Sequence, residues 1–131
     1  MKLLLDTSAY SLLMRNHIGV KSAIEQAEEI AMNPVVIAEL HAGFLKGHQT
    51  KRNRAELEEF ITSSGVHIVD IDADTGEMFA VIIHGLRIAG TPIPTNDIWI
   101  AASAMRHGMR LLTADRHFLK VPQILLNLVE L

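Results

Sequence analysis

Four acidic residues stand where an α/β protein could bring them to one place: Asp6, Glu39, Asp97 and Asp115. Asp6 directly follows the apolar run Lys2–Leu5, and Asp115 comes shortly after the apolar run Arg110–Thr113. Such runs without polar alternation are typical of strands buried on both faces of a parallel sheet. Since ligands of open α/β sheets bind beyond the carboxyl ends of the strands, both acids are placed for chemistry.

The other two acids lie on predicted helices. Asp97 belongs to the stretch PTNDIWIAASA, which predicts an alanine-rich helix capped by Thr95 or Asn96. Glu39 stands at the apolar border of a helix containing VVIAEL, where it is either tolerated at an edge or held by a cation. Each acid also has an ordinary explanation, because Asp6 and Asp97 could simply stabilise helix starts.

A cluster of these carboxylates would need protons or cations. Two carboxylates about 4 Å apart repel by roughly 4 kcal/mol at an effective dielectric constant of about 20. The seven histidines are scattered and cysteine is absent, so oxygen ligands favour Mg²⁺ or Mn²⁺ over zinc. Acid-held Mg²⁺ can activate a water molecule for in-line displacement at a phosphodiester, and no Ser, Cys or His nucleophile is required.

Predicted strands and helices alternate along the chain. We expect strands at 2–5, 29–32, 66–71, 110–113 and 128–130, and helices at 8–15, 20–28, 34–46, 51–63, 73–89 and 97–107. Thr7 and Ser8 are the expected caps of the first helix. The alternation predicts an α/β fold with a mostly parallel central sheet and helices on both faces.

Composition limits the class of protein. The 131 residues suit one domain, 1–131, and the formal net charge of −3 argues against a strongly basic nucleic-acid coat. The lack of cysteine fits a reducing cytoplasm, and the first residues are too short an apolar run for a signal peptide. No apolar run reaches membrane-spanning length. We therefore expect a soluble cytoplasmic protein without a membrane segment.

The motifs LLLDTSAY, VVIAEL, IPTNDIWIAA and LLTADRHF, in this order, resemble those of PIN-domain ribonucleases, and most of all the VapC-type toxins of toxin–antitoxin pairs. The resemblance spans Leu3 to about Phe118. It implies a three-layer α/β/α sandwich and Mg²⁺-dependent endonucleolytic cleavage of RNA, with Mn²⁺ as a possible substitute, leaving a 5′-phosphate and a 3′-hydroxyl.

The resemblance also implies roles for individual residues. Asp6 and Asp97 match direct metal ligands, Glu39 matches a ligand of a second metal or a water, and Asp115 completes the acidic quartet. The small polar positions that orient the acids or the metal-bound water are matched by Ser8, Asn96 and Thr113. Candidate contacts to RNA phosphates are Arg116, Arg87, Lys46, Lys51 and Arg52.

Partners follow from the same resemblance. Family members are typically homodimers, and a cognate antitoxin wraps the toxin and places a side chain near its active site. The broad apolar face of the predicted helix 73–89 also favours a second subunit, although burial inside one chain could explain it.

Other functions stay open at this point. The chain could be a PIN-like RNA-processing nuclease that is not a toxin, or a non-catalytic α/β interaction module whose acids only cap helices. A haloacid-dehalogenase-like phosphatase fits less well. It expects an acid two positions after Asp6, where Ser8 stands, and a lysine that is missing from Gly90–Asp97.

Overall fold

The computed structural model describes residues 1–131 and contains five strands and six α-helices. The strands are β1 (Lys2–Leu5), β2 (Glu29–Met32), β3 (Val66–Ile68), β4 (Arg110–Thr113) and β5 (Leu126–Leu128). The helices are α1 (Thr7–Met14), α2 (Ile18–Gln26), α3 (Pro34–Lys46), α4 (Thr50–Ile61), α5 (Ala73–Ala89) and α6 (Thr95–His107), with a short 3₁₀ helix, η1 (Arg116–Lys120).

The five strands form one sheet in the order β3-β2-β1-β4-β5, and every pair is parallel. Leu4 in β1 pairs with Ala31 in β2 on one side and with Leu111 in β4 on the other. From β1 the chain builds the sheet outward through β2 and β3, and then returns to add β4 and β5 on the opposite side.

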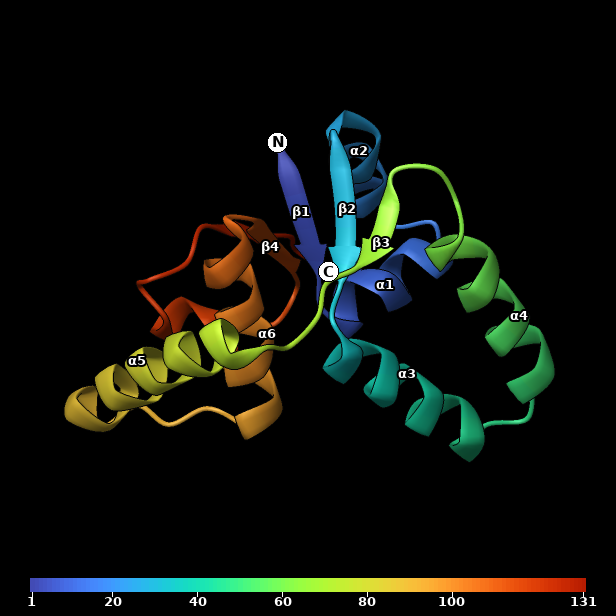
Figure 1. Cartoon of the computed structure of the whole chain (residues 1–131). Helices are drawn as coiled ribbons and strands as arrows, with labels where there is room; N and C mark the ends of the chain where they lie inside the picture. Colours follow the sequence, from blue (N-terminus) through green and yellow to red (C-terminus); the bar gives the residue numbers. More distant parts are fainter.

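This strand order decides where the helices lie. Parallel strands are joined by right-handed crossovers, so helices before and after the reversal cover opposite faces of the sheet. Accordingly, α3 and α4 lie on one side of the sheet in Figure 1, and α5 and α6 lie on the other. The result is the predicted α/β/α arrangement, with a sheet that is wholly rather than mostly parallel.

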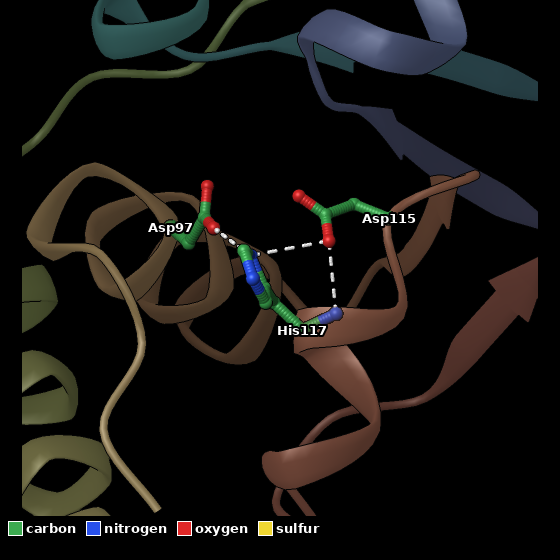
Figure 2. Close-up of side chains that lie close together, drawn as sticks. All are labelled: Asp97, Asp115 and His117. Atoms are coloured by element: carbon green, nitrogen blue, oxygen red, sulfur yellow. Dashed lines mark hydrogen bonds and ion pairs between the residues drawn. The ribbon is translucent and has the colours of Figure 1, made fainter.

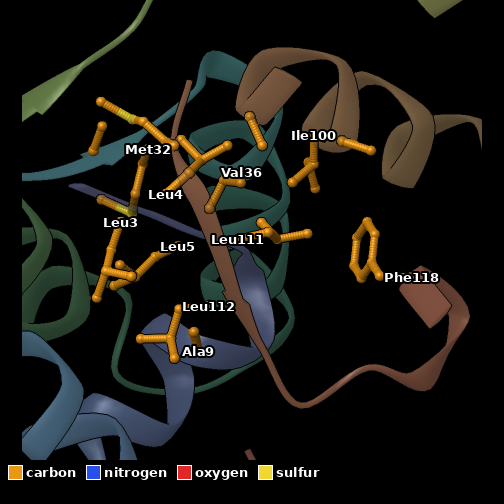
Figure 3. Close-up of a cluster of buried hydrophobic side chains, with 14 of the residues drawn as sticks. Leu3, Leu4, Leu5, Ala9, Met32, Val36, Ile100, Leu111, Leu112 and Phe118 are labelled. Atoms are coloured by element: carbon orange, nitrogen blue, oxygen red, sulfur yellow. The ribbon is translucent and has the colours of Figure 1, made fainter. Parts of the chain in front are cut away.

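The core is centred on β1 and β4 (Figure 3). Leucines of β1 and β4 are fully buried because helices cover both faces of these strands, which explains the unalternating apolar runs. Each fully buried leucine stabilises the fold by about 1.5–3 kcal/mol relative to an exposed one. The core therefore fixes the ends of β1 and β4, from which Asp6 and Asp115 emerge.

Some predicted boundaries were wrong by a few residues. The last strand is Leu126–Leu128 rather than 128–130, because Leu126 pairs with Leu111 and Leu128 with Thr113 of β4. The third strand stops at Ile68, although the Val69 N–H still donates to Met32. Helix α2 begins at Ile18 rather than at residue 20, because the His17 ring caps it by accepting from the Val20 N–H.

Helix α5 has the predicted bounds and packs against α6 (Figure 1). Asp72 and Thr75 form a reciprocal capping box at its start, and Gly90, in the left-handed conformation with φ 69°, ends it. Val81 and Ile88 on this helix are 48% and 75% exposed. At 17 residues α5 is the longest helix, and none of the helices has the length and apolarity needed to cross a membrane.

Candidate active site

The acidic residues meet at the point where the strand order reverses. Asp6 follows β1 and Asp115 follows β4, and these strands are neighbours although α1–α6 separate them in the chain. At such a switch point the loops of adjacent strands leave toward opposite faces and open a crevice at the carboxyl edge of the sheet. The topology therefore makes this edge the natural ligand site.

Asp6 is the most deeply held of the four carboxylates, with only 4% of the residue exposed. Its Oδ1 accepts hydrogen bonds from the Ser8 hydroxyl (2.7 Å) and the Ala9 N–H (2.8 Å). The second of these bonds caps α1, so the expected caps Thr7 and Ser8 were wrong: the Asp6 carboxylate already takes that role. Burial nevertheless raises the pKa of Asp6, because desolvation outweighs these hydrogen bonds and the charge of Asp115 adds to it.

Thr113, the last residue of β4, joins the two acidic loops. Its hydroxyl donates to Oδ2 of Asp6 and accepts from the Asp115 N–H at 2.9 Å. The Ser8 hydroxyl oxygen accepts from the Ala114 N–H at 3.0 Å. Ser8 and Thr113, predicted to orient the acids, thus fix the start of α1 against the end of β4.

Glu39 projects from α3 and is held at both carboxylate oxygens. The Thr7 hydroxyl donates to Oε1 (2.6 Å), and the Asn96 side-chain amide donates to Oε2 (3.3 Å). Sequence reasoning assigned Thr7 only a capping role, since its partner lies 32 positions away. Glu39 is thereby oriented by residues at the starts of α1 and α6.

Asn33 sets the position of α3 relative to α6. Its side-chain oxygen caps α3 by accepting from the Val36 N–H at 3.0 Å, as expected for an Asn before a helix-starting Pro. Its side-chain N–H group donates to the Ser103 hydroxyl (3.0 Å) and the Trp99 carbonyl (3.4 Å) of α6. Asn33 is fully buried, so this one residue links the helices that bear Glu39 and Asp97.

The start of α6 differs from the predicted cap. The helix begins at Thr95 with Pro94 as N-cap residue, and no side chain caps it. The Pro94 carbonyl accepts from the Asp97 N–H (3.0 Å), while the Asn96 amide points to Glu39 instead. Asp97 itself lies in the first turn with 14% of its side chain exposed.

The electrostatic environment of Asp97 is unfavourable to its charge. Burial and then the negative charge of Asp115 raise the pKa of Asp97 to about 6, with a smaller contribution from Glu39. The hydrogen bond and charge of His117 act in the opposite direction. A carboxylate held in this state is a strong site for a proton or a cation.

His117 was not predicted as a site residue, and the structure places it between two of the acids (Figure 2). Asp115 caps η1 by accepting from the His117 N–H at 2.9 Å. This turn brings the His117 Nδ1 to 3.2 Å from Asp115 Oδ1 and 3.3 Å from Asp97 Oδ2. The sequence signal is the Asp-x-His spacing in TADRHF, which was interpreted only as a turn after β4.

All four acids line one cavity of about 280 Å³. Its wall is completed by three small polar residues and an apolar residue of α6; the full set is Asp6, Thr7, Ser8, Ser11, Glu39, Asp97, Ile100 and Asp115. No lysine or arginine forms an ion pair with any of the four carboxylates, and His117 is the only basic side chain within 4 Å of their oxygens. This dense set of oxygen donors, in which the pKa values of Asp6 and Asp97 are raised, fits a divalent cation.

The predicted phosphate-contacting residues do not gather at one place. Arg52 lines a second cavity of about 270 Å³, which also contains Arg15 and shares Ser11 with the acidic cavity. Arg87 lines a separate cavity between α5 and the start of α6. The remaining three, Lys46, Lys51 and Arg116, are exposed on α3, α4 and η1.

The sheet order and the four converging acids define the chain as an α/β protein with an acidic crevice at its switch point. The family described as PIN domain matches residues 3–124, and the chain belongs to this family. The resemblance found in the sequence motifs is thereby confirmed.

The chain is similar in sequence to two proteins named as VapC ribonucleases. The chain is 31% identical over 124 residues to Ribonuclease VapC2 of Haemophilus influenzae, covering 92% of each protein. It is 29% identical over 96 residues to Ribonuclease VapC4 of Mycobacterium tuberculosis, covering 73% of this chain and 74% of that protein.

Solved structures agree in fold. A structure of VapBC2 from Rickettsia felis, bound to a DNA fragment from its promoter, matches with a TM-score of 0.85 at 25% identity, covering 97% of this chain and 98% of that one. VapBC-1 from nontypeable Haemophilus influenzae also matches with a TM-score of 0.85, at 21% identity and covering 98% of both chains. The second likeness concerns the fold alone.

Proposed function

We propose that this chain is a metal-dependent endoribonuclease that hydrolyses RNA phosphodiester bonds, and that it is the toxin of a toxin–antitoxin pair. The convergence of four carboxylates on one cavity without a lysine or arginine counter-charge is the observation on which the proposal rests. The names of the VapC ribonuclease relatives support the reaction and the RNA substrate.

Each acid has a proposed role. Asp6 and Asp97 bind Mg²⁺, or Mn²⁺ in its place, directly, and Glu39 binds a second cation or a water molecule; Asp115 completes the set. When bound, such an ion neutralises the phosphate and makes water more acidic. Ser8 and Thr113 hold the Asp6 oxygens in place, and Thr7 and Asn96 hold Glu39, so the donors are fixed before substrate arrives.

The proposed reaction is the hydrolysis of one RNA phosphodiester bond. Water adds to phosphorus, the bond from phosphorus to O3′ breaks, and the products are a 5′-phosphate and a 3′-hydroxyl. Because Asp97 has a pKa of about 6, it is ionised above that pH even without a cation. Asp97 is therefore charged and ready to hold the ion at neutral pH.

We further propose that RNA crosses the acidic cavity toward α4. The neighbouring cavity shares Ser11 with the acidic one and contains Arg15 and Arg52, which can contact phosphates on one side of the scissile bond. Lys51 precedes Arg52 on α4 and Lys46 ends α3, and Arg116 directly follows Asp115 in the chain; all three are exposed. Arg87 lines a different cavity that contains none of the acids, so we do not include it in this path.

The direct test is cleavage of a 5′-labelled single-stranded RNA with Mg²⁺, with Mn²⁺ and with EDTA. We expect cleavage only with metal, and a loss of about 10²-fold or more in Asp97→Asn, because the variant removes a metal ligand. The matched control is Asp70→Asn, since Asp70 is exposed and outside the cavity. Cleavage in EDTA, or an unaffected Asp97→Asn, would contradict the proposal.

The proposed partners are a cognate antitoxin and a second copy of the chain, in the cytoplasm. The structural neighbours named VapBC support the first, and exposed Val81 and Ile88 on α5 support the second.

Expression of the chain alone should arrest growth, and Asp6→Ala should relieve the arrest. Unimpeded growth with measurable RNA cleavage would instead indicate an RNA-processing nuclease. Absence of any metal response would indicate a non-catalytic module.

Light scattering after gel filtration tests the dimer. A dimer that becomes a monomer in a Val81→Glu, Ile88→Glu double variant would place the interface on α5. A wild-type monomer at micromolar concentration would exclude it.

A further inference from the structure

His117 is the only side chain with a nitrogen ligand in the acidic cluster. Its Nδ1 and one oxygen each of Asp97 and Asp115 all lie within 4.8 Å of one another (Figure 2). The histidine is held there by local structure, because Asp115 caps η1 through the His117 backbone N–H. The ring is therefore directed by the same carboxylate that it faces.

The spacing of these atoms matches a coordination shell. Two ligands bonded to one cation at about 2.1 Å lie about 3.0 Å apart at a right angle and about 3.4 Å apart at a tetrahedral angle. Nδ1 lies 3.2 Å from Asp115 Oδ1 and 3.3 Å from Asp97 Oδ2. These two spacings are compatible with a cation bound by His117 Nδ1 together with either carboxylate oxygen.

We propose that His117 is a ligand to the divalent cation of this site, and that it makes the site prefer Mn²⁺, Co²⁺ or Zn²⁺ over Mg²⁺. This inference rests on the proposed metal-dependent function. Imidazole nitrogen suits transition metals, whereas Mg²⁺ is bound almost entirely by oxygen. The sequence predicts oxygen donors, and this proposal adds one nitrogen donor to them.

The same distances would also fit an ion pair between a protonated His117 and the two carboxylates. The two roles predict different effects on metal binding when His117 is removed. An imidazolium competes with any divalent cation, so its removal would leave binding unchanged or tighten it equally for every metal. A nitrogen ligand favours transition metals, so its removal would weaken Mn²⁺ and Co²⁺ selectively.

The experiment is calorimetric titration of MnCl₂, CoCl₂ and MgCl₂ into the wild-type chain, His117→Ala and His117→Lys at one pH above 7. We expect His117→Ala to weaken Mn²⁺ and Co²⁺ binding about tenfold or more and Mg²⁺ binding less than about threefold. His117→Lys supplies a positive charge but no free nitrogen lone pair, and should also lose the preference. His67→Ala, an exposed histidine of β3, is the matched control.

A second readout does not involve affinity. Paramagnetic Co²⁺ should shift the imidazole proton resonances of His117 strongly and leave those of His67 unshifted. With 48% of its side chain exposed, His117 can be replaced without loss of the fold, which circular dichroism checks.

The outcomes separate this inference from the proposed function. Equal effects on all three metals, or tighter binding in His117→Ala, overturn the ligand role while metal-dependent RNA cleavage by the wild type stands. No binding of any metal to the wild type at millimolar concentration overturns both. A selective loss with intact Mg²⁺ binding establishes His117 as the residue that determines metal preference.

Discussion

The Thr113 hydroxyl donates a hydrogen bond to Oδ2 of Asp6, although the two residues are 107 positions apart. Thr113 is fully buried at the end of β4, and Asp6 emerges from the neighbouring β1. The same hydroxyl accepts from the Asp115 N–H, so one oxygen atom positions two of the four acids. The geometry of the acidic edge therefore depends on a contact between adjacent strands.

Replacing Thr113 with valine should lower the free energy of unfolding by about 1–3 kcal/mol, because it leaves a buried carboxylate oxygen and a backbone N–H without partners. Urea unfolding measures the change. The control is Thr62→Val, whose exposed hydroxyl bonds only to carbonyls at the end of α4. That variant should change the free energy of unfolding by no more than about 0.5 kcal/mol. Equal effects in the two variants would count against the proposed role of Thr113.

Asp97→Asn should stabilise the metal-free protein above pH 6. Asp97 has a pKa of about 6 in the folded state, raised from 3.8, so the folded state binds its proton more tightly than the unfolded state does. The stability that this proton contributes is present below pH 3.8 and is lost as pH rises through 6. At pH 7.5 we expect the variant to gain on the order of 2 kcal/mol, and at pH 4 almost nothing.

Thermal unfolding in EDTA at the two pH values measures this difference. Asp70→Asn provides the baseline for replacing an exposed Asp. A variant that gains equally at both pH values would show that the charge of Asp97 is not the cause.

Mg²⁺ or Mn²⁺ should raise the unfolding midpoint of the wild type. A cation bound only by the folded state stabilises it by about 2.7 kcal/mol at a concentration one hundred times its Kd. Asp97→Asn should lose most of this response because it removes a ligand that faces the cavity. Scans with 0 to 10 mM metal, about the range for a weak surface site, test both chains. A flat response in the wild type would remove the support for a cation in this cavity.

Asn33→Ala should strongly lower the free energy of unfolding. It removes the cap of α3 and leaves the buried Ser103 hydroxyl without the Asn33 side chain that donates to it. We expect a loss of about 2–4 kcal/mol, against about 1 kcal/mol for Asp72→Ala, which removes an exposed cap of α5. Urea unfolding compares the two. RNA cleavage by Asn33→Ala should also fall, because α3 and α6 place Glu39 and Asp97.

Arg52→Ala and Arg15→Ala should weaken RNA binding rather than cleavage chemistry. Both side chains line the cavity next to the acidic one, and loss of one phosphate contact should reduce the slope of log K against log salt by about 1. Fluorescence anisotropy in an Asp97→Asn background avoids cleavage during the measurement. Lys21→Ala, on exposed α2, serves as control. An unchanged slope in both arginine variants would place the RNA elsewhere.

Local sequence patterns were sufficient to predict the five strands and six α-helices and to single out the four acids. The unalternating run at Lys2–Leu5 predicted a strand buried on both faces, and the helix bounds at 34–46 and 73–89 were confirmed at both ends. These features depend on side chains a few positions apart, through apolar periodicity, capping and glycine stops. The acids Asp6 and Asp115 could be placed at strand ends for the same reason.

Tertiary structure decided everything that depends on distant partners. The sequence does not state that β1 lies beside β4, yet this adjacency brings Asp6 and Asp115 to one crevice. It could not show that the Asn96 amide leaves the helix start for Glu39, 57 positions away, so the predicted cap was wrong. His117 faces Asp97 for the same reason, since a contact between η1 and α6 exists only once the sheet has assembled. Short-range patterns determine which elements form, whereas the packing of those elements determines which side chains meet.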